Sequence, residues 1–307
     1  MFRKVNLKHL IILFASLLLA VILVNLADRK KGNRSFKGNL IEYQADQISK
    51  IQVSPKVMQG GRVELIKENG QWFVPANQKK FRADQNLVRS LINGINGLTP
   101  ESVISGKKER WKDYEVTDSL GTRVQLYRGE AQEADLVFGK VSYSAQGGKS
   151  YVRLTGDNMV YRISGMQASE CNRDLNGFKD KTVISSDKSS WEKLTFSYPA
   201  DSSFVLAKNG EKWELDGQAA DSTEVARFLN AIASLNHYQL AKDDPAGTGN
   251  FGLKIEGAKL NPAIDVRGFQ DGDQFAAASS QNQGVYFEGN SLKEKLFPSK
   301  SKFLKNN

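Results

Sequence analysis

Apolar and polar residues alternate along this chain with two periods, one typical of helices and one typical of strands. The helical period is clearest in two stretches, where apolar residues recur at i, i+3, i+4, i+7 and i+10. The stretches are ADQNLVRSLINGINGL at 83–98 and ADSTEVARFLNAIASL at 220–235. An apolar stripe along one side is typical of an amphipathic helix that packs on a core. Each stretch therefore predicts one such helix.

An Ala-Asp pair precedes both stripes. Asp84 and Asp221 are placed to act as N-caps, whose carboxylates accept hydrogen bonds from the first free backbone amides of a helix. Glu224, three residues after Asp221, also gives the second stretch the spacing of a capping box. We expect the two helices to begin directly after these aspartates.

Segments with the two-residue period of strands precede both predicted helices. The aligned pairs are 39–53 with 182–196, and 63–74 with 204–215. The second pair contains an Asn-Gly turn followed by a tryptophan, Trp72 or Trp213. Alternating apolar residues around Asn-Gly are a strong hairpin signal. We assign both tryptophans to the core between sheet and helix, because large aromatic side chains dominate cores.

The correspondence continues beyond the helices, and the chain is interpreted as a tandem duplication. The matched segments are 114–116 with 251–253, 123–129 with 263–269, and 150–156 with 284–290. The predicted organisation is 1–37 as cytoplasmic tail, transmembrane anchor and basic juxtamembrane segment, 38–163 as first repeat, 164–180 as linker, 181–297 as second repeat, and 298–307 as basic tail.

Short turns join the predicted strands, whereas parallel strands would need long crossover connections. The predicted fold class is therefore α+β. It consists of an N-terminal transmembrane helix followed by two tandem repeats, each an antiparallel sheet packed on one amphipathic helix.

Residues 10–27, LIILFASLLLAVILVNLA, contain no charged residue and are long enough to span a bilayer. A cleaved signal peptide is the alternative, but cuts after Ala20 or Ala27 lack the small-residue pattern of a cleavage site. We interpret the run as an uncleaved anchor. Basic residues lie on both sides of it, and the excess after it favours a cytoplasmic C-terminal side, so charge alone leaves the orientation open.

The net charge of +9 is concentrated outside the repeats. Most of the positive charge lies in residues 1–37 and in the tail 298–307, while residues 38–297 are close to neutral. A basic groove for a phosphate backbone is not indicated, so we expect no nucleic-acid partner. The cluster beside the apolar run is instead placed to meet lipid headgroups.

The sequence assigns no catalytic, cofactor-binding or metal-binding residue. GGKS (147–150) resembles the end of a phosphate-binding loop, but the motif requires glycine where Tyr143 stands. Cys171 and His237 form a conceivable nucleophile and base, although Cys171 lies in the predicted linker and a free cysteine is more often a small buried side chain. No zinc spacing is present.

Two carboxylate pairs occur in turn-like segments, Asp243 with Asp244 and Asp271 with Asp273. A calcium loop needs more oxygen ligands at fixed spacing, so solvated turns are favoured. KKERWKDY (107–114) mixes cations with aromatics and is a possible contact surface, with Tyr114 assigned to the core by its match to Phe251. A group of charged residues in and directly after the predicted linker either fixes the angle between the repeats or is solvated; its members are Arg173, Asp174, Lys179, Asp180 and Lys181.

The order of these signals resembles a bacterial family catalogued as a domain of unknown function, whose members are encoded beside gliding-motility-type ABC transporters. The resemblance is carried by the apolar run, NGQWFVPANQKKFRADQNLVRSLINGINGL, RVQLYRG, SYVRLTG, MVYRIS and DLNGFKDKTVISSD. These are patterns of fold rather than chemistry, and the family supplies no catalytic residues. The resemblance implies a protein at the cytoplasmic membrane with its repeats extracytoplasmic. It also implies the permease and ATPase subunits of an ABC transporter as partners.

Three functions are therefore considered. The first is a non-enzymatic single-pass membrane protein that acts as an accessory or interaction component of an ABC transporter, contacting the bilayer through residues 10–27. The second is a module that binds a cell-envelope polymer through faces between the repeats. The third is an unrecognised hydrolase that uses Cys171 or paired carboxylates. No cofactor is expected for any of them.

Overall fold

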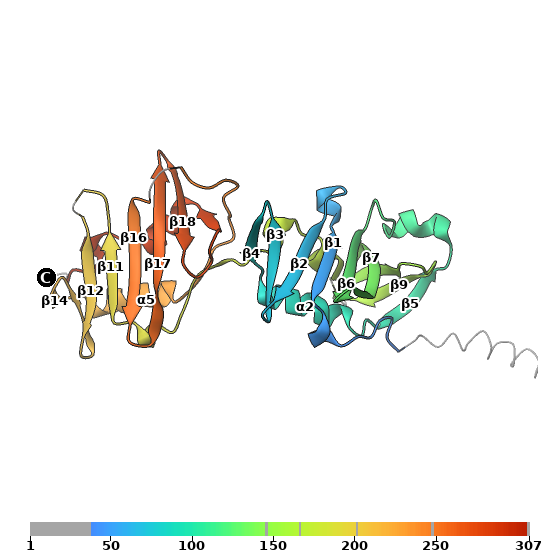
Figure 1. Ribbon diagram of the computed structural model, residues 1–307, viewed down its shortest axis with the longest axis horizontal. Coiled ribbons are helices and arrows are strands. Elements are labelled where there is room, and N and C mark those ends of the chain that lie inside the picture. Colours follow the sequence, from blue (N-terminus) through green and yellow to red (C-terminus); the bar gives the residue numbers. More distant parts are fainter. Residues whose placement is uncertain (1–37, 145–146, 166, 201, 247–248, 306–307) are drawn as a thin grey trace, which may run out of the picture.

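The computed structural model describes residues 38–305 except 145–146, 166, 201 and 247–248. Two units lie side by side along the long axis of the molecule (Figure 1). Each unit has one apolar core and one large antiparallel sheet. Alternate residues of the central strands are buried, as in β1 and β11, because one face of each sheet packs on the core and the other faces solvent.

The first unit contains a nine-stranded sheet of order β4-β3-β2-β1-β6-β7-β8-β9-β5. Its strands are β1 Lys50–Ser54, β2 Val63–Glu68, β3 Gln71–Ala76, β4 Lys79–Arg82, β5 Pro100–Ser105, β6 Thr122–Arg128, β7 Ala131–Ser144, β8 Gly147–Leu154 and β9 Val160–Ser164. Its helical segments are η1 Ala45–Gln47, η2 Lys56–Met58, α2 Gln85–Ile95, η3 Lys108–Tyr114, α3 Gln167–Cys171 and α4 Leu175–Phe178.

The second unit contains an eight-stranded sheet of order β14-β13-β12-β11-β16-β17-β18-β19 and a separate pair, β10-β15. Its strands are β10 Thr182–Ser185, β11 Lys193–Ser197, β12 Phe204–Asn209, β13 Lys212–Leu215, β14 Gln218–Ala219, β15 Ser234–Asn236, β16 Phe251–Gly257, β17 Leu260–Asp271, β18 Gln274–Ser279 and β19 Tyr286–Glu288. Its helical segments are η4 Lys188–Ser190, α5 Ser222–Ile232, α6 Asn290–Leu296 and η5 Lys300–Phe303.

Both predicted helices and both N-caps are confirmed. Asp84 accepts hydrogen bonds from the first amides of α2, and Asp221 does the same for α5. The capping box is not formed as expected. The side chain of Glu224 pairs with Arg227, and the backbone amide of Asp221 donates to the carbonyl oxygen of Phe303 at 2.9 Å. Trp72 is buried as predicted, whereas Trp213 is half-buried against the second core.

The predicted fold class is wrong. Strands make up 44% and helices 22% of the structure, so the units are mostly antiparallel sheet. Each sheet is also accompanied by several helical segments rather than by one helix. The strands missed in the first unit, β4 and β5, have no alternating burial because they lie at the two edges of the sheet. Sequence periodicity is a weak guide to such strands.

The expected transmembrane helix, residues 10–27, lies outside the described residues. Within the part of the chain that the structure describes, no helix combines the length and the hydropathy that crossing a bilayer requires.

The repeat extends through both units, but its register after the helices differs from the prediction. β1 pairs with β6 and β11 pairs with β16, so Thr122 corresponds to Phe251 rather than Tyr114. The segment 123–129 therefore matches β16 and not 263–269. Successive strands of one sheet share the same alternation, so a slip by one strand preserves the apolar pattern. Segment 108–114 forms η3, which precedes β6 and has no buried residue.

Each unit is completed by a phenylalanine outside the predicted repeat boundaries. Phe178, in the predicted linker 164–180, and Phe303, in the predicted basic tail 298–307, are both fully buried. Their carbonyl oxygens accept hydrogen bonds of 2.9 Å from the amides of Asp84 and Asp221 respectively. Ala168 and Cys171 of the predicted linker also belong to the first core. The last segment of each unit thus packs at the N-terminus of its own helix.

The chain passes between the units directly after Phe178. Residue Asp180 donates its amide to the carbonyl of Arg82 at 2.8 Å, and its carboxylate lies 3.3 Å from the Arg82 guanidinium. Its own carbonyl accepts from Asn282 Nδ2 of the second unit at 2.9 Å. Phe81 packs against both cores, and the ammonium of Lys179 lies 3.8 Å from its ring centroid. Linker charges therefore form the junction between the units.

The buried side chain of Phe303 gives the first prediction. Replacing Phe303 by alanine removes a ring packed 5.4 Å from that of Phe228 and is expected to lower the free energy of unfolding by about 3–5 kcal/mol. Leu304 is 49% exposed, so its alanine variant serves as the matched control and is expected to change stability by less than about 0.5 kcal/mol. Urea unfolding measures the free energy of unfolding of both variants. Equal values for the two variants would contradict the burial of Phe303 in the core of the second unit.

Lys181 gives the second prediction. Burial, and then the charge of Lys179, lower its pKa to about 8. Between that value and the ordinary lysine pKa near 10.4, the unfolded chain binds a proton that the folded chain does not. The unfolding free energy of the wild type should therefore rise relative to that of Lys181→Met as pH increases from 8 to 10. Urea unfolding of both proteins along that series measures the difference, and a constant difference would refute the assignment.

Candidate functional site

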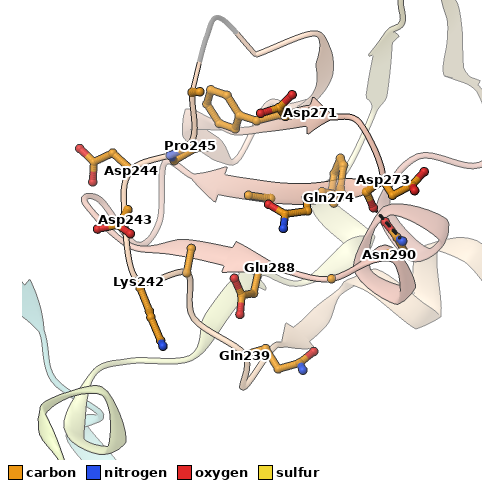
Figure 2. Close-up of a pocket in the computed structure, with 16 residues that line it drawn as sticks. Gln239, Lys242, Asp243, Asp244, Pro245, Asp271, Asp273, Gln274, Glu288 and Asn290 are labelled. Carbon is orange, nitrogen blue, oxygen red and sulfur yellow. Dashed lines mark hydrogen bonds between the residues drawn. The ribbon is translucent and has the colours of Figure 1, made fainter.

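A hollow of about 710 Å³ lies at the end of the second unit that faces the first (Figure 2). Three segments build it. Residues 239–241 pair with β19, through Ala241 N–H to Tyr286 O at 2.9 Å and Glu288 N–H to Gln239 O at 3.0 Å. The turn between β17 and β18 forms the second side, and the start of α6 the third.

The β17–β18 turn is fixed by its own sequence. Gly272 adopts a φ of 54°, which glycine tolerates readily. The side-chain amide of Gln270 donates to the carbonyls of Gly272 and Gln274 at 2.6 and 3.1 Å. Asn290 Nδ2 then donates to the carbonyl of Asp273 at 3.1 Å, which ties the turn to α6. The two turn aspartates are thereby held at the rim of the hollow.

The hollow is strongly acidic. Its carboxylates are Asp243, Asp244, Asp271, Asp273 and Glu288, and one lysine, Lys242, lines it. Asp244 pairs with Lys79 of the first unit at 3.1 Å, so this rim touches the junction. No ion pair forms at the other four carboxylates within the described residues. They remain acceptors for a cation or for hydroxyl and amide donors.

The sequence predicts two separate solvated turns for the aspartate pairs, whereas the structure brings both pairs to one hollow. The two aspartate pairs come together because segment 239–241 pairs with β19. No local sequence pattern predicts this pairing. Glu288, Gln239 and Asn290 were not identified from sequence for the same reason. Figure 2 shows the carboxylates spaced around the hollow instead of gathered at one point. Among the residues that the structure describes, no group of three His, Cys, Asp or Glu is placed to hold a metal ion.

The candidate catalytic pair is not assembled. Cys171 belongs to the first core, where burial raises the pKa of its thiol well above the usual range. His237 belongs to the second unit. Its ring packs on Phe287, and its Nε2 lies 2.7 Å from the carbonyl of Glu288. A thiol held in its protonated form, away from a base, is a poor nucleophile.

The GGKS segment begins strand β8, as expected for a hairpin and unlike a phosphate-binding loop. Lys149 forms an ion pair of 2.6 Å with Glu101. KKERWKDY forms η3, in which Trp111 covers the buried guanidinium of Arg153 at 4.0 Å. Tyr114, predicted to be core, is half-buried and packs its ring 5.0 Å from that of Tyr151.

A family model described as Domain of unknown function (DUF4340) matches residues 72–254, from β3 of the first unit to β16 of the second. The matched region therefore includes both N-capped helices and the junction between the units. No curated protein and no solved structure matches the chain.

Cys171 supplies the prediction for this site. A maleimide should leave native Cys171 unmodified and should react with it fully in 8 M urea, because burial and a raised pKa both suppress thiolate formation. Val57→Cys places a second thiol at a position that is 56% exposed in the wild type and should react at once in the native state. Rapid native modification of Cys171, followed by mass spectrometry, would reinstate it as a candidate nucleophile.

Proposed function

The chain belongs to the DUF4340 family, and we propose that it is a non-enzymatic membrane protein serving as an accessory component of an ABC transporter. In this proposal the lipid bilayer is contacted through residues 10–27, and the two units stand on the extracytoplasmic side. The partners are the permease and ATPase subunits implied by the resemblance of the sequence to proteins encoded beside gliding-motility-type transporters.

One observation of the structure carries the proposal. The two units are joined through Arg82, Asp180 and Asn282, and Phe81 lies between both cores. Two units joined in this way present one extended surface to a large partner, whereas separate units would have to be ordered on binding at an entropic cost. The family match spans this junction, which supports a shared role for the pair of units rather than for either alone.

The distribution of chemical groups supports an interaction role. Cys171 and His237 lie in different units. The acidic hollow offers exposed carboxylates beside the junction, and such groups recognise cationic segments of a partner and speed its approach. An interface of this kind needs no proton transfer or nucleophile.

The test is a mild-detergent pull-down of the full-length tagged chain from native membranes, with mass spectrometry of the recovered proteins. We expect a permease and its ATPase in near-stoichiometric amounts. Arg82→Glu opposes Asp180 and loosens the junction, so it should reduce that recovery several-fold. Arg89→Glu makes the same charge change at an exposed position of α2 and should recover as much as the wild type.

Recovery of the chain without any transporter subunit would refute the proposal. Equal recovery with Arg82→Glu and Arg89→Glu would show that the joined arrangement of the units is not what the partner recognises. Circular dichroism on both variants separates a loosened junction from a failure to fold.

A second candidate function is a module that binds a cell-envelope polymer. The acidic hollow favours it, because one wall carries the ring of Phe269 and its rim carries the amides of Gln239, Gln274 and Asn290 beside carboxylates. An aromatic ring beside polar acceptors and donors offers such a polymer both an apolar contact and hydrogen bonds. If the pull-down yields the chain alone and the chain sediments with isolated envelope material in a salt-tolerant way, this candidate replaces the first.

A further inference from the structure

A second hollow, of about 380 Å³, lies where β11 ends and β12 and β16 begin. Its walls are aromatic and come from Tyr198, Phe204, Phe251 and Phe297. The rings of Phe251 and Phe297 are 5.4 Å apart, and that of Tyr198 meets Phe251 edge-on at 5.6 Å. The Tyr198 hydroxyl donates to the carbonyl of Pro298 at 2.6 Å, so this side chain offers the hollow mainly its ring. The size is at the lower end of sites for small molecules.

The charged groups of this hollow are all positive. Lys293 and Lys300 line it, and none of the carboxylates that the structure describes does. Lys300 pairs with Asp216, outside the lining. Lys293 is half-buried, and its ammonium lies 4.8 Å from the centroid of the Phe251 ring. Among the described residues it has no carboxylate partner within ion-pair distance. A half-buried cation beside apolar walls leaves its hydrogen-bonding capacity for an anion.

The two repeats differ at this place. In the first unit, η2 follows β1 and covers the corresponding corner. The amide of Lys56 donates to Thr122 Oγ1 at 3.2 Å, and that of Val57 donates to Asn172 Oδ1 at 3.0 Å. In the second unit, Phe251 takes the position of buried Thr122, and its ring lines an open hollow. The corner that is covered in one repeat is therefore a cavity in the other.

We propose that this hollow binds a small amphiphilic anion, with an aromatic or short acyl body against the rings of Tyr198, Phe251 and Phe297 and a carboxylate or phosphate head on Lys293. Ser203 also lines the hollow, and its hydroxyl accepts from the Tyr198 amide at 3.0 Å, which leaves its proton to donate to such a head. This site is separate from the acidic hollow, and it does not depend on the transporter partnership.

The test uses two anionic probes, 2-naphthoate and 2-naphthyl phosphate, and the neutral alcohol 2-naphthalenemethanol. Full-length protein in detergent is titrated with each by isothermal calorimetry, and a titration of protein-free micelles is subtracted. We expect saturable binding of at least one anion and binding at least tenfold weaker for the alcohol, since a charge-assisted hydrogen bond is absent. The preferred head group distinguishes a carboxylate ligand from a phosphate ligand.

Lys293→Met keeps the length of the side chain and removes the charge. It should weaken anion binding at least tenfold and leave binding of the alcohol unchanged. Lys295→Met, on the same helix but outside the lining, is the matched control and should bind like the wild type. The proposal is overturned if no probe binds at millimolar concentration. Equal affinity of Lys293→Met and wild type for the anions, with unchanged thermal unfolding of the variant, overturns it as well.

Discussion

In each unit one hydrogen bond, from the amide of the helix-capping aspartate to the carbonyl of a buried phenylalanine, positions the last segment on the core. Asp84 binds Phe178 in this way, and Asp221 binds Phe303. A capping residue already satisfies the first amides of its helix with its side chain, so its own amide is left to hold another segment. That segment brings a large ring into the core. In the first unit it also fixes where the chain leaves, and the residues that follow form the junction.

The elements predicted well from sequence are those set by local rules. Both helices, both caps and the Asn-Gly hairpins depend on neighbours within a few residues. The linker and the tail are not recognisable from sequence as parts of the core, because Phe178 and Phe303 lie in mostly polar segments and a single buried ring produces no periodicity. The sequence match pairs Tyr114 with Phe251 instead of Thr122, because neighbouring strands share the same alternation of apolar and polar residues. The acidic hollow depends on pairing between segments distant in sequence, which composition does not reveal.

The two repeats share one architecture and differ in their surfaces. The first carries η3, where Trp111 covers Arg153, and the second carries the acidic hollow and the aromatic hollow. Thr122 of the first repeat accepts a hydrogen bond at this corner, whereas the corresponding residue of the second repeat, Phe251, places its ring in the wall of a hollow. Duplication of a stable unit allows such divergence, because the sheet and core of each copy are maintained by residues away from these corners. Function in this chain is therefore expected at the sites where the copies differ and at the junction that joins them.

The contacts of Arg82, Asp180, Asn282 and Phe81 hold the two units as one body. Pulsed electron–electron double resonance between spin labels at Val57→Cys and Lys259→Cys tests this most directly, because both positions are exposed, one lies in each unit, and buried Cys171 stays unlabelled. Units held as one body give a single narrow distance distribution in the full-length protein. A broad distribution in the otherwise folded protein would contradict it, since the units would then move independently.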